Sequence, residues 1–279
     1  MVVKMQFEKI TKQFSFYIPY YLLSLLALLC LKLFYSRAGA DNLTWILTPT
    51  TGWVSILSGI PFTYAPGEGY VNHSLRFIIA PSCCGIRFLG ITAAMLIFSF
   101  LHRTGCGSPG RSIRWILGSL GFSYLFTIFV NGLRILLSIY IPLGLSGAGI
   151  YIRWLTPERL HTLIGTAVYF SSLLILYRAV SLICLGKPSA FSRPPFVRSC
   201  LSPVFWYFFI VLGLPALNSS YAESRGRFSE YAALISAACL ILLLLYGTIH
   251  LLIIFPQKIK RTFGFDGIIK SRYRKKRNH

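Results

Sequence analysis

Long runs of apolar residues alternate with short polar segments along the whole chain. Six of these runs come close to the roughly 20 residues that a helix needs to cross a bilayer. The pattern therefore predicts six membrane-spanning helices. They are Tyr17 to Phe34, Cys84 to Leu101, Ile116 to Tyr140, Leu163 to Cys184, Leu201 to Leu217 and Tyr231 to Phe255.

A seventh run, Leu43 to Ile60, is weaker because Pro49 and Gly52 interrupt it and threonine is frequent in it. We expect this run to be a re-entrant or interfacial segment, and we do not assign it as a span. The fold class predicted from the pattern is all-α: a polytopic helical bundle in the membrane with about six to eight transmembrane helices.

Composition agrees with a membrane protein, because 55% of the residues are apolar and only 13% are charged. The net charge of +21 does not indicate a nucleic-acid partner, since no compact soluble domain is present to carry a binding face. The charge instead indicates topology. With the N-terminus inside and six spans, 18 lysines and arginines fall on the inner side and six on the outer side. This bias predicts a multi-pass protein of the cell (inner) membrane with a cytoplasmic C-terminus.

The chain is expected to divide into four parts. Because Tyr17 to Phe34 is long and lacks a small-residue cleavage site, we interpret it as the first anchor and not as a cleaved signal peptide. Proline in the polar stretch after the fourth span indicates a connector, and the basic end is suited to anionic lipid headgroups of the bilayer. The parts are a membrane-embedded domain (1–185), a cytoplasmic connector (186–200), additional transmembrane helices (201–255) and a basic cytoplasmic tail (256–279).

Two of the seven cysteines are adjacent, in the stretch "PSCCGIRFLG" at the start of the second span. Cys83 and Cys84 are the only cysteines expected at the outer surface, so neither has another outer cysteine with which to form a structural disulfide. The chain has no C-x-x-C and no H-x-x-x-H pattern, and carboxylates are few. We therefore expect no metal and no cofactor.

Two further polar residues are expected at the same depth as Cys83. Arg134 lies near the outer end of the third span, three residues after Asn131 and on the same helical face, and His161 begins the fourth span. An arginine in a span needs a partner or a wet cavity, or else it extends to the headgroups. Alone, His161 would be an ordinary interfacial histidine. Arg87, one turn after Cys83, would either tune the thiol or extend to the headgroups.

Together, the three residue types suit acyl transfer through a thioester. A free thiol has a pKa of ~8.5 and is scarcely ionised at neutral pH, so a catalytic cysteine needs a base, and a histidine can form a thiolate–imidazolium pair with it. A guanidinium carries a permanent charge and fixed donors, which suit it to stabilise the oxyanion of a tetrahedral intermediate. The sequence predicts that Cys83, Arg134 and His161 meet near the outer surface.

These residues resemble a known family. Cys83-Cys84-Gly85-Ile86, Asn131-Gly132-Leu133-Arg134-Ile135 and His161 occur in the order typical of the exosortase and archaeosortase membrane transpeptidases, and "LTPTTGWVSILSGIPF" is similar to the Pro-Thr segment that precedes the nucleophile there. The similarity runs from about Thr44 to Gly165. Cys84 departs from it, since Ser or Thr usually follows the nucleophile, and residues after Phe191 show no resemblance.

The resemblance implies that Cys83 is the nucleophile, Arg134 the oxyanion stabiliser and His161 the base. It implies a cysteine peptidase or transpeptidase whose partners are exported proteins with a C-terminal sorting signal, made of a short motif, a transmembrane helix and a basic end. The cleaved product would pass to an unknown surface acceptor.

Two alternatives remain open from the residues alone. In a membrane transporter or scaffold, Arg134 and His161 would line a path or hold a lipid headgroup, although the spans lack acidic residues for ion coupling and the two thiols would have no role. A membrane acyltransferase acting on lipid or glycan would use the same outer residues as the transpeptidase.

Overall fold

The computed structural model describes residues 2–104, 107–149, 153–185, 196–217 and 225–262. The chain forms two compact units, Met1–Ile235 and Ser236–His279. All the candidate site residues belong to the first unit. Within the expected connector (186–200), residues 186–195 lie outside the described residues. Within the expected basic tail (256–279), residues 263–279 lie outside them.

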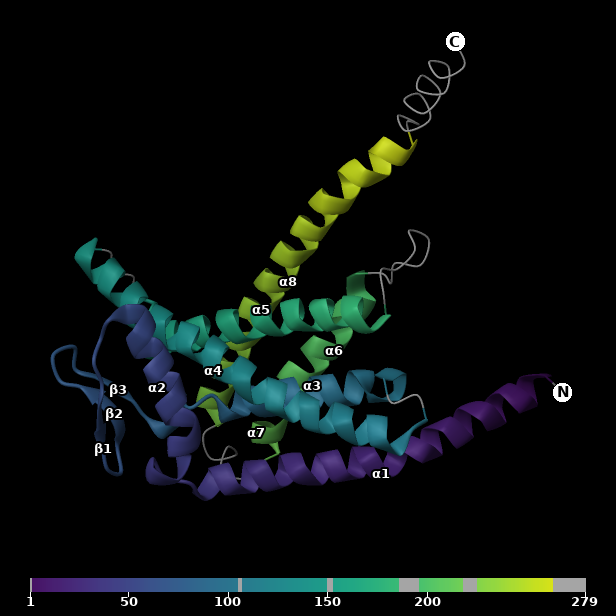
Figure 1. The fold of residues 1–279 in the computed structure, drawn as a ribbon. Helices are drawn as coiled ribbons and strands as arrows, with labels where there is room; N and C mark the ends of the chain where they lie inside the picture. The colour runs from purple at the N-terminus through teal and green to yellow at the C-terminus, as the bar shows by residue number, and fades with distance from the viewer. Residues whose placement is uncertain (1, 105–106, 150–152, 186–195, 218–224, 263–279) are drawn as a thin grey trace, which may run out of the picture. The chain divides into compact units, whose positions relative to one another are not determined.

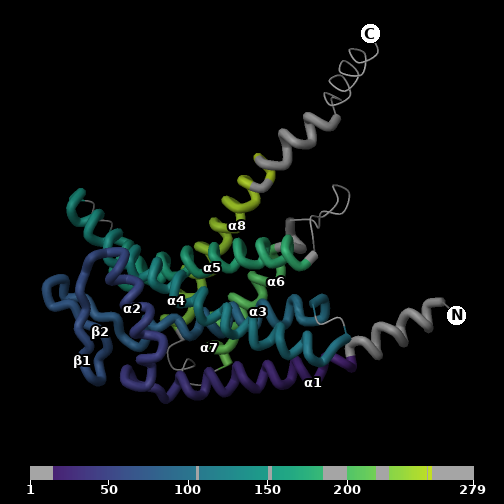
Figure 2. The backbone as a smooth tube through the Cα atoms, in the orientation of Figure 1, coloured from purple at the N-terminus to yellow at the C-terminus, as the bar shows by residue number. Residues whose placement is uncertain are grey.

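The described chain is mostly helical (Figure 1). The long helices are α1 (Val2–Arg37), α3 (Ile86–Thr104), α4 (Pro109–Gly147), α5 (Pro157–Leu185) and α8 (Arg225–Thr262). The short helical segments are η1 (Asp41–Leu43), α2 (Thr44–Ser58), η2 (Pro81–Cys83), α6 (Phe196–Phe208), the π-helical turn η3 (Phe209–Gly213) and α7 (Leu214–Ala216). In the first unit α3 packs against α4, and α4 packs against α5 (Figure 2).

Five of the described helices are long and apolar enough to cross a membrane. They correspond to five of the six predicted spans, and their candidate spanning parts are Ser15–Arg37, Pro81–Thr104, Pro109–Gly147, Pro157–Cys184 and Gly226–Ile249. The remaining predicted span, Leu201 to Leu217, corresponds to a shorter apolar helical segment, Cys200–Ala216. The chain is therefore a multi-pass membrane protein by the length and composition of its helices.

The weak seventh run is helix α2, which is continuous through Pro49 and Gly52. The sequence had suggested that these residues break it. Pro49 cannot donate to the carbonyl of Trp45 one turn earlier, but the hydroxyl of Tyr124 donates to that carbonyl at 2.7 Å. The hydrogen bond lost at the proline is thus replaced from α4. At 15 residues, α2 is about 22 Å long, which is less than the hydrocarbon core of a bilayer.

A small antiparallel sheet corrects the all-α prediction. Strands β1 (Thr63–Ala65), β2 (Gly69–Asn72) and β3 (Phe77–Ile79) follow in the order β1-β2-β3, with Thr63 paired to Val71 and Tyr70 paired to Ile79. Strands of three or four residues are too short for an alternation of apolar and polar residues to be recognised clearly. Residues 66–68, which include the turn-forming Pro66 and Gly67, were the available signal for the first hairpin.

The sheet is fastened to the segment before α2. The carboxylate of Asp41 accepts hydrogen bonds from the hydroxyl of Tyr64 and from the backbone N–H of Gly67. The hydrogen bond from Tyr64, and then that from Gly67, lowers the pKa of Asp41 below its ordinary value, and the same contact raises the pKa of Tyr64. β3 then leads through Ala80 directly into η2 and Cys83.

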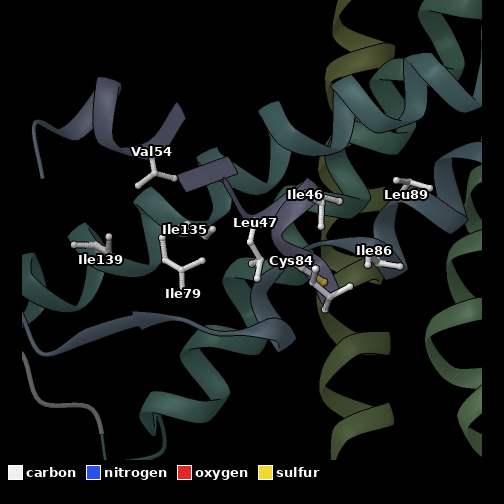
Figure 3. Close-up of a cluster of buried hydrophobic side chains, with 10 residues drawn as sticks. Ile46, Leu47, Val54, Ile79, Cys84, Ile86, Leu89, Ile135 and Ile139 are labelled. Carbon is white, nitrogen blue, oxygen red and sulfur yellow. The ribbon is translucent and has the colours of Figure 1, made fainter. Parts of the chain in front are cut away.

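An apolar cluster lies where α2, β3, α3 and α4 meet (Figure 3). Aliphatic side chains from all four elements fill it, and the sulfur of Cys84 lies among them. Close packing between α2 and α4 depends on Gly132, because a Cβ there would lie 2.5 Å from a ring carbon of Trp53. The buried members are Leu43, Ile46, Leu47, Val54, Ile79, Cys84, Ile86, Leu89, Ile135 and Ile139.

Candidate active site

Cys83 ends the short turn η2, just before α3 begins at Ile86. Its backbone N–H donates to the carbonyl of Ala80 at 2.8 Å, which closes the turn. The thiol is partly exposed, whereas the next residue, Cys84, is buried. The turn therefore directs the two adjacent thiols into different surroundings.

Gly85 allows this turn to lie against α4. It has a φ of +78°, a conformation that costs an ordinary L-residue about 1–2 kcal/mol. A Cβ at this position would also lie 3.0 Å from side-chain carbons of Asn131 and Thr127. The glycine in "CCGI" is thus required both by the backbone and by the close approach of α4.

Asn131 on α4 holds the backbone of the cysteine turn. Its side-chain Nδ2 donates to the carbonyl of Cys83 at 2.6 Å, and the residue is fully buried. Its Oδ1 accepts from the hydroxyl of Tyr169 at 2.6 Å and from Nη1 of Arg134 at 3.2 Å. Asn131 was a secondary candidate in the sequence, and here it links the cysteine turn to the arginine.

Arg134 is the centre of the site. It lies one turn after Asn131 and is only 6% exposed, so its charge is almost wholly removed from solvent. Nη1 donates to the hydroxyl of Tyr169 at 3.0 Å, and the guanidinium lies 5.5 Å from the centre of the same ring. Nη2 contacts Sγ of Cys83 at 3.9 Å and Nε2 of His161 at 2.5 Å. One nitrogen of the guanidinium thus contacts both the thiol and the imidazole.

The contact between Arg134 and His161 sets the state of the imidazole. A guanidinium has only donors, so a hydrogen bond between Nη2 and Nε2 requires the lone pair of Nε2. The imidazole in this arrangement is neutral, with its proton on Nδ1. Nε2 can accept a proton only when Arg134 releases this lone pair.

The structure brings together all three residues that the sequence placed at one depth. One detail differs from the expected thiolate–imidazolium pair. Among the described contacts Cys83 and His161 are not hydrogen-bonded to each other, because Arg134 lies between them. A thiolate at Cys83 would have the guanidinium as its nearest cation.

The other secondary candidates, Cys84 and Arg87, separate clearly. Cys84 is 1% exposed and belongs to the apolar cluster. Arg87 is exposed on the first turn of α3, and it lines a cavity together with Arg134 and His161. Neither side chain has a hydrogen bond to Cys83, Arg134 or His161 in the described part of the chain.

A cavity of about 340 Å³ opens beside these residues. Arg87, Arg134 and His161 supply its polar lining together with several hydroxyl groups, and the residues known to line it include no carboxylate. Such a lining favours a ligand that is anionic or becomes so during reaction. Its other walls are apolar and aromatic, and some of them come from the late helices, for example Tyr207, Val211 and Tyr231.

The late wall residues could not be found from the motifs, because the sequence resemblance ends before them. Val211 belongs to the π-helical turn η3, an uncommon element that often occurs at functional sites. Tyr207 lies on α6, and Tyr231 lies on the part of α8 that belongs to the first unit. Residues after Phe191 therefore contribute directly to this cavity.

Tyr169 belongs to the candidate site, although the sequence motifs did not indicate it. Its hydroxyl joins Asn131 to Arg134, and its ring stacks on Phe88 of α3 with centroids 4.4 Å apart. The available signal was its spacing, since eight residues after His161 place it two turns along a similar face of α5. The apolar run around it concealed that signal.

Within the described ranges no three histidine, cysteine, aspartate or glutamate side chains converge in a way that could hold a metal ion. The chemistry that this arrangement offers directly is that of a thiol, a guanidinium and an imidazole.

Comparison of the chain with protein-family models, with characterised proteins and with solved structures finds no match.

Proposed function

We propose that this protein is a membrane cysteine peptidase or transpeptidase, of the exosortase-like kind, acting through a thioester on Cys83. The observation that carries the proposal is the position of Arg134, whose Nη2 contacts both Sγ of Cys83 and Nε2 of His161 at the edge of a cavity. A nucleophile, a base and a buried cation within reach of one another are the parts that acyl transfer needs.

The first step would be attack of Cys83 on a peptide carbonyl. The thiol proton passes to Nε2 of His161, the sulfur bonds to the carbonyl carbon, and the oxyanion is stabilised by the guanidinium of Arg134. As the C–N bond breaks, His161 returns the proton to the leaving amine. The product is an acyl thioester on Cys83, which an amine, a hydroxyl or water then resolves.

The substrate class follows from the resemblance together with the membrane setting. We propose exported proteins that carry a C-terminal sorting signal: a short motif, a transmembrane helix and a basic end. Because Cys83 lies just before the start of α3 and His161 lies near the start of α5, a peptide bond held near the membrane surface is the one they can reach. The proposal places this end at the extracytoplasmic face of the cell (inner) membrane and the C-terminus in the cytoplasm.

The decisive experiment compares the C-termini of membrane proteins in cells that carry the wild-type chain and cells that carry Cys83→Ala. Quantitative C-terminal proteomics should show a set of exported proteins that are truncated only with the wild-type enzyme. Their uncut forms should share a motif, an apolar span and a basic end. An unchanged set of C-termini contradicts the peptidase proposal.

A chemical assay tests the thioester apart from the natural substrate. Full-length protein in nanodiscs is treated with phenyl thioacetate, and the acetylated residue is located by mass spectrometry. We expect acetyl transfer to Cys83 with release of thiophenol. A thioester that forms on Cys83 while no protein C-terminus changes in cells would favour a membrane acyltransferase.

A further inference from the structure

A second cavity, of about 580 Å³, lies between the last turns of α4 and the first turns of α5. His161 lines this cavity as well as the one that contains Arg134. His161 therefore borders both cavities, and the first of them is also lined by Arg134.

Ser138 brings hydrogen-bond acceptors to the second cavity. Ser138 is 9% exposed, lines the cavity, and has a hydroxyl without a hydrogen-bond partner in the described chain. Residue 142 is proline, so it cannot donate to the carbonyl of Ser138 as a helical residue would. A buried hydroxyl and a carbonyl without its helical donor thus lie one helical turn along α4 from Arg134, which contacts His161. Such groups are costly unless a ligand or water satisfies them.

The rest of the cavity lining is mainly apolar, and it includes the arginine Arg153. Its wall includes Leu145, Leu155, Leu160 and Ile164. Ser146 lies eight residues after Ser138 on α4, a rise of about 12 Å along the helix. Arg153, which follows α4, also lines the cavity and is exposed, and within the described ranges it has no ion pair. The lining of the cavity therefore combines hydrogen-bond acceptors at Ser138, apolar side chains and the cation of Arg153.

We propose that this second cavity binds the acceptor, a molecule with a primary amine or hydroxyl joined by an apolar spacer to an anionic group. The inference rests on the thioester proposed for Cys83. The anion binds at Arg153, the spacer lies on the leucines, and the nucleophile donates a hydrogen bond to Ser138 beside His161. The donor enters from the cavity of Arg134 and the acceptor from the second cavity, and both cavities border His161.

The transfer step balances with the groups present. The acceptor nitrogen attacks the thioester carbonyl of Cys83 and loses a proton to Nε2 of His161. The new C–N bond forms, the C–S bond breaks, and the departing sulfur takes the proton back from His161. The enzyme returns to its starting state without an oxidant, a reductant or a metal.

The test uses acetylated enzyme in phosphatidylcholine nanodiscs, whose lipid offers no amine. Cys83 is acetylated with phenyl thioacetate, excess reagent is removed, and loss of the acetyl group is followed by mass spectrometry. The probes are 8-aminooctanoate, 4-aminobutyrate and octylamine. Each rate is divided by the rate of the same amine with S-acetyl-N-acetylcysteine in solution, which removes differences in intrinsic reactivity.

We expect 8-aminooctanoate to deacylate Cys83 roughly fivefold faster than octylamine, the upper range for an exposed ion pair, and also faster than the shorter 4-aminobutyrate. Octylamine concentrates in the bilayer, so this preference cannot arise from partitioning. Arg153→Gln should remove the preference, whereas Arg76→Gln, an exposed arginine outside the cavity, should keep it.

A second variant fills the cavity. Leu145→Trp should slow deacylation by 8-aminooctanoate, while Leu143→Trp, two residues away and 51% exposed, should not. Equal normalised rates for all three amines, or a preference that survives Arg153→Gln, overturns the acceptor cavity even if Cys83 is acetylated. Failure of Cys83 to become acetylated defeats the proposed function, and the acceptor cavity with it.

Discussion

Cys83 and Cys84 are neighbours in the chain, yet they lie in two different regions of the molecule. Cys83 is partly exposed and contacts a buried arginine, which in turn contacts a histidine. Cys84 is buried among aliphatic side chains of α2, β3, α3 and α4 (Figure 3). An ionised sulfur at Cys84 would be a buried charge without a cation beside it. The comparison teaches that one turn of backbone can place two adjacent thiols in different environments, one beside a guanidinium and one among aliphatic side chains.

The largest effect that we predict from this comparison is the loss of acetylation when the thiol of Cys83 is removed. Cys83→Ala should reduce acetylation by phenyl thioacetate at least about a thousandfold, the order of loss seen when a catalytic nucleophile is removed. Cys84→Ser should retain it, because that side chain does not face Arg134. The measurement is the rate of thiophenol release from the purified variants. An active Cys83→Ala together with an inactive Cys84→Ser would exchange the two assignments.

Arg134→Lys should be the next most damaging change. A lysine keeps the charge but cannot reach Asn131, Tyr169, Cys83 and His161 with one planar group. We expect the rate of acetylation to fall about a hundredfold, as for loss of an oxyanion donor. Arg114→Lys, an exposed arginine near the start of the same helix, serves as the matched control. Equal rates for the two variants would show that Arg134 contributes only charge.

Gly85→Ala should damage the turn that separates the two thiols. The positive φ costs about 1–2 kcal/mol of folding stability, and the new Cβ would press against Asn131 and Thr127. Gly90→Ala is the control, since the added Cβ meets nothing within 4 Å and alanine favours a helix. Thermal unfolding in detergent should show a lower midpoint for Gly85→Ala alone. An unchanged midpoint would mean that the turn relaxes freely.

Tyr169→Phe tests whether the hydroxyl positions Arg134. The ring can keep its stacking on Phe88, but Asn131 and Arg134 each lose a partner. We expect acetylation to slow about tenfold, which corresponds to 1.4 kcal/mol and lies within the usual cost of an unmet buried partner. Tyr177→Phe on the same helix is the control. A purely structural role would lower stability and leave the rate of the folded fraction unchanged.

The smallest effect should come from Asp41, which fastens the sheet that contributes Ile79 to the surroundings of Cys84. Its folded pKa is lowered by hydrogen bonds from Tyr64 and Gly67. The stabilisation is therefore present above the ordinary carboxyl pKa of about 4 and is lost as the pH falls through the lower, folded pKa. The difference in unfolding midpoint between wild type and Asp41→Asn should be present at pH 7 and should vanish in acid. A difference independent of pH would show that the carboxylate charge is not involved.

The sequence predicted much of the site because the ends of consecutive helices constrain depth. Cys83, Arg134 and His161 each lie near the end of an apolar run, so alternating helix directions place them at one level. Tyr169 escaped notice because a tyrosine within a span resembles any other apolar position, and only its contacts with Asn131 and Arg134 give it a role. The walls supplied by Tyr207 and Val211 depend on packing between distant segments, which no local pattern records.

The fold was predicted in the same uneven way. The length and apolar character of the runs gave the long helices, because each must satisfy its own backbone in a membrane. Helix α2 and the sheet depend on partners instead. Pro49 is tolerated because Tyr124 supplies the missing donor, and the short strands depend on turns at Gly67 and Gly69, both with positive φ. These partners lie far away in sequence or consist of only a few residues. The local secondary-structure propensity of each segment therefore did not predict helix α2 or the sheet.

The bond from Tyr124 to the carbonyl of Trp45 makes residues 49 and 124 epistatic. With proline at 49, loss of the hydroxyl leaves a carbonyl unmet. With alanine at 49, the restored N–H would meet that carbonyl, and phenylalanine at 124 would be nearly neutral. A double-mutant cycle would therefore give a coupling energy of about 1 kcal/mol or more between two residues 75 positions apart. Among descendants of this chain, proline at 49 and tyrosine at 124 would tend to be kept or lost together.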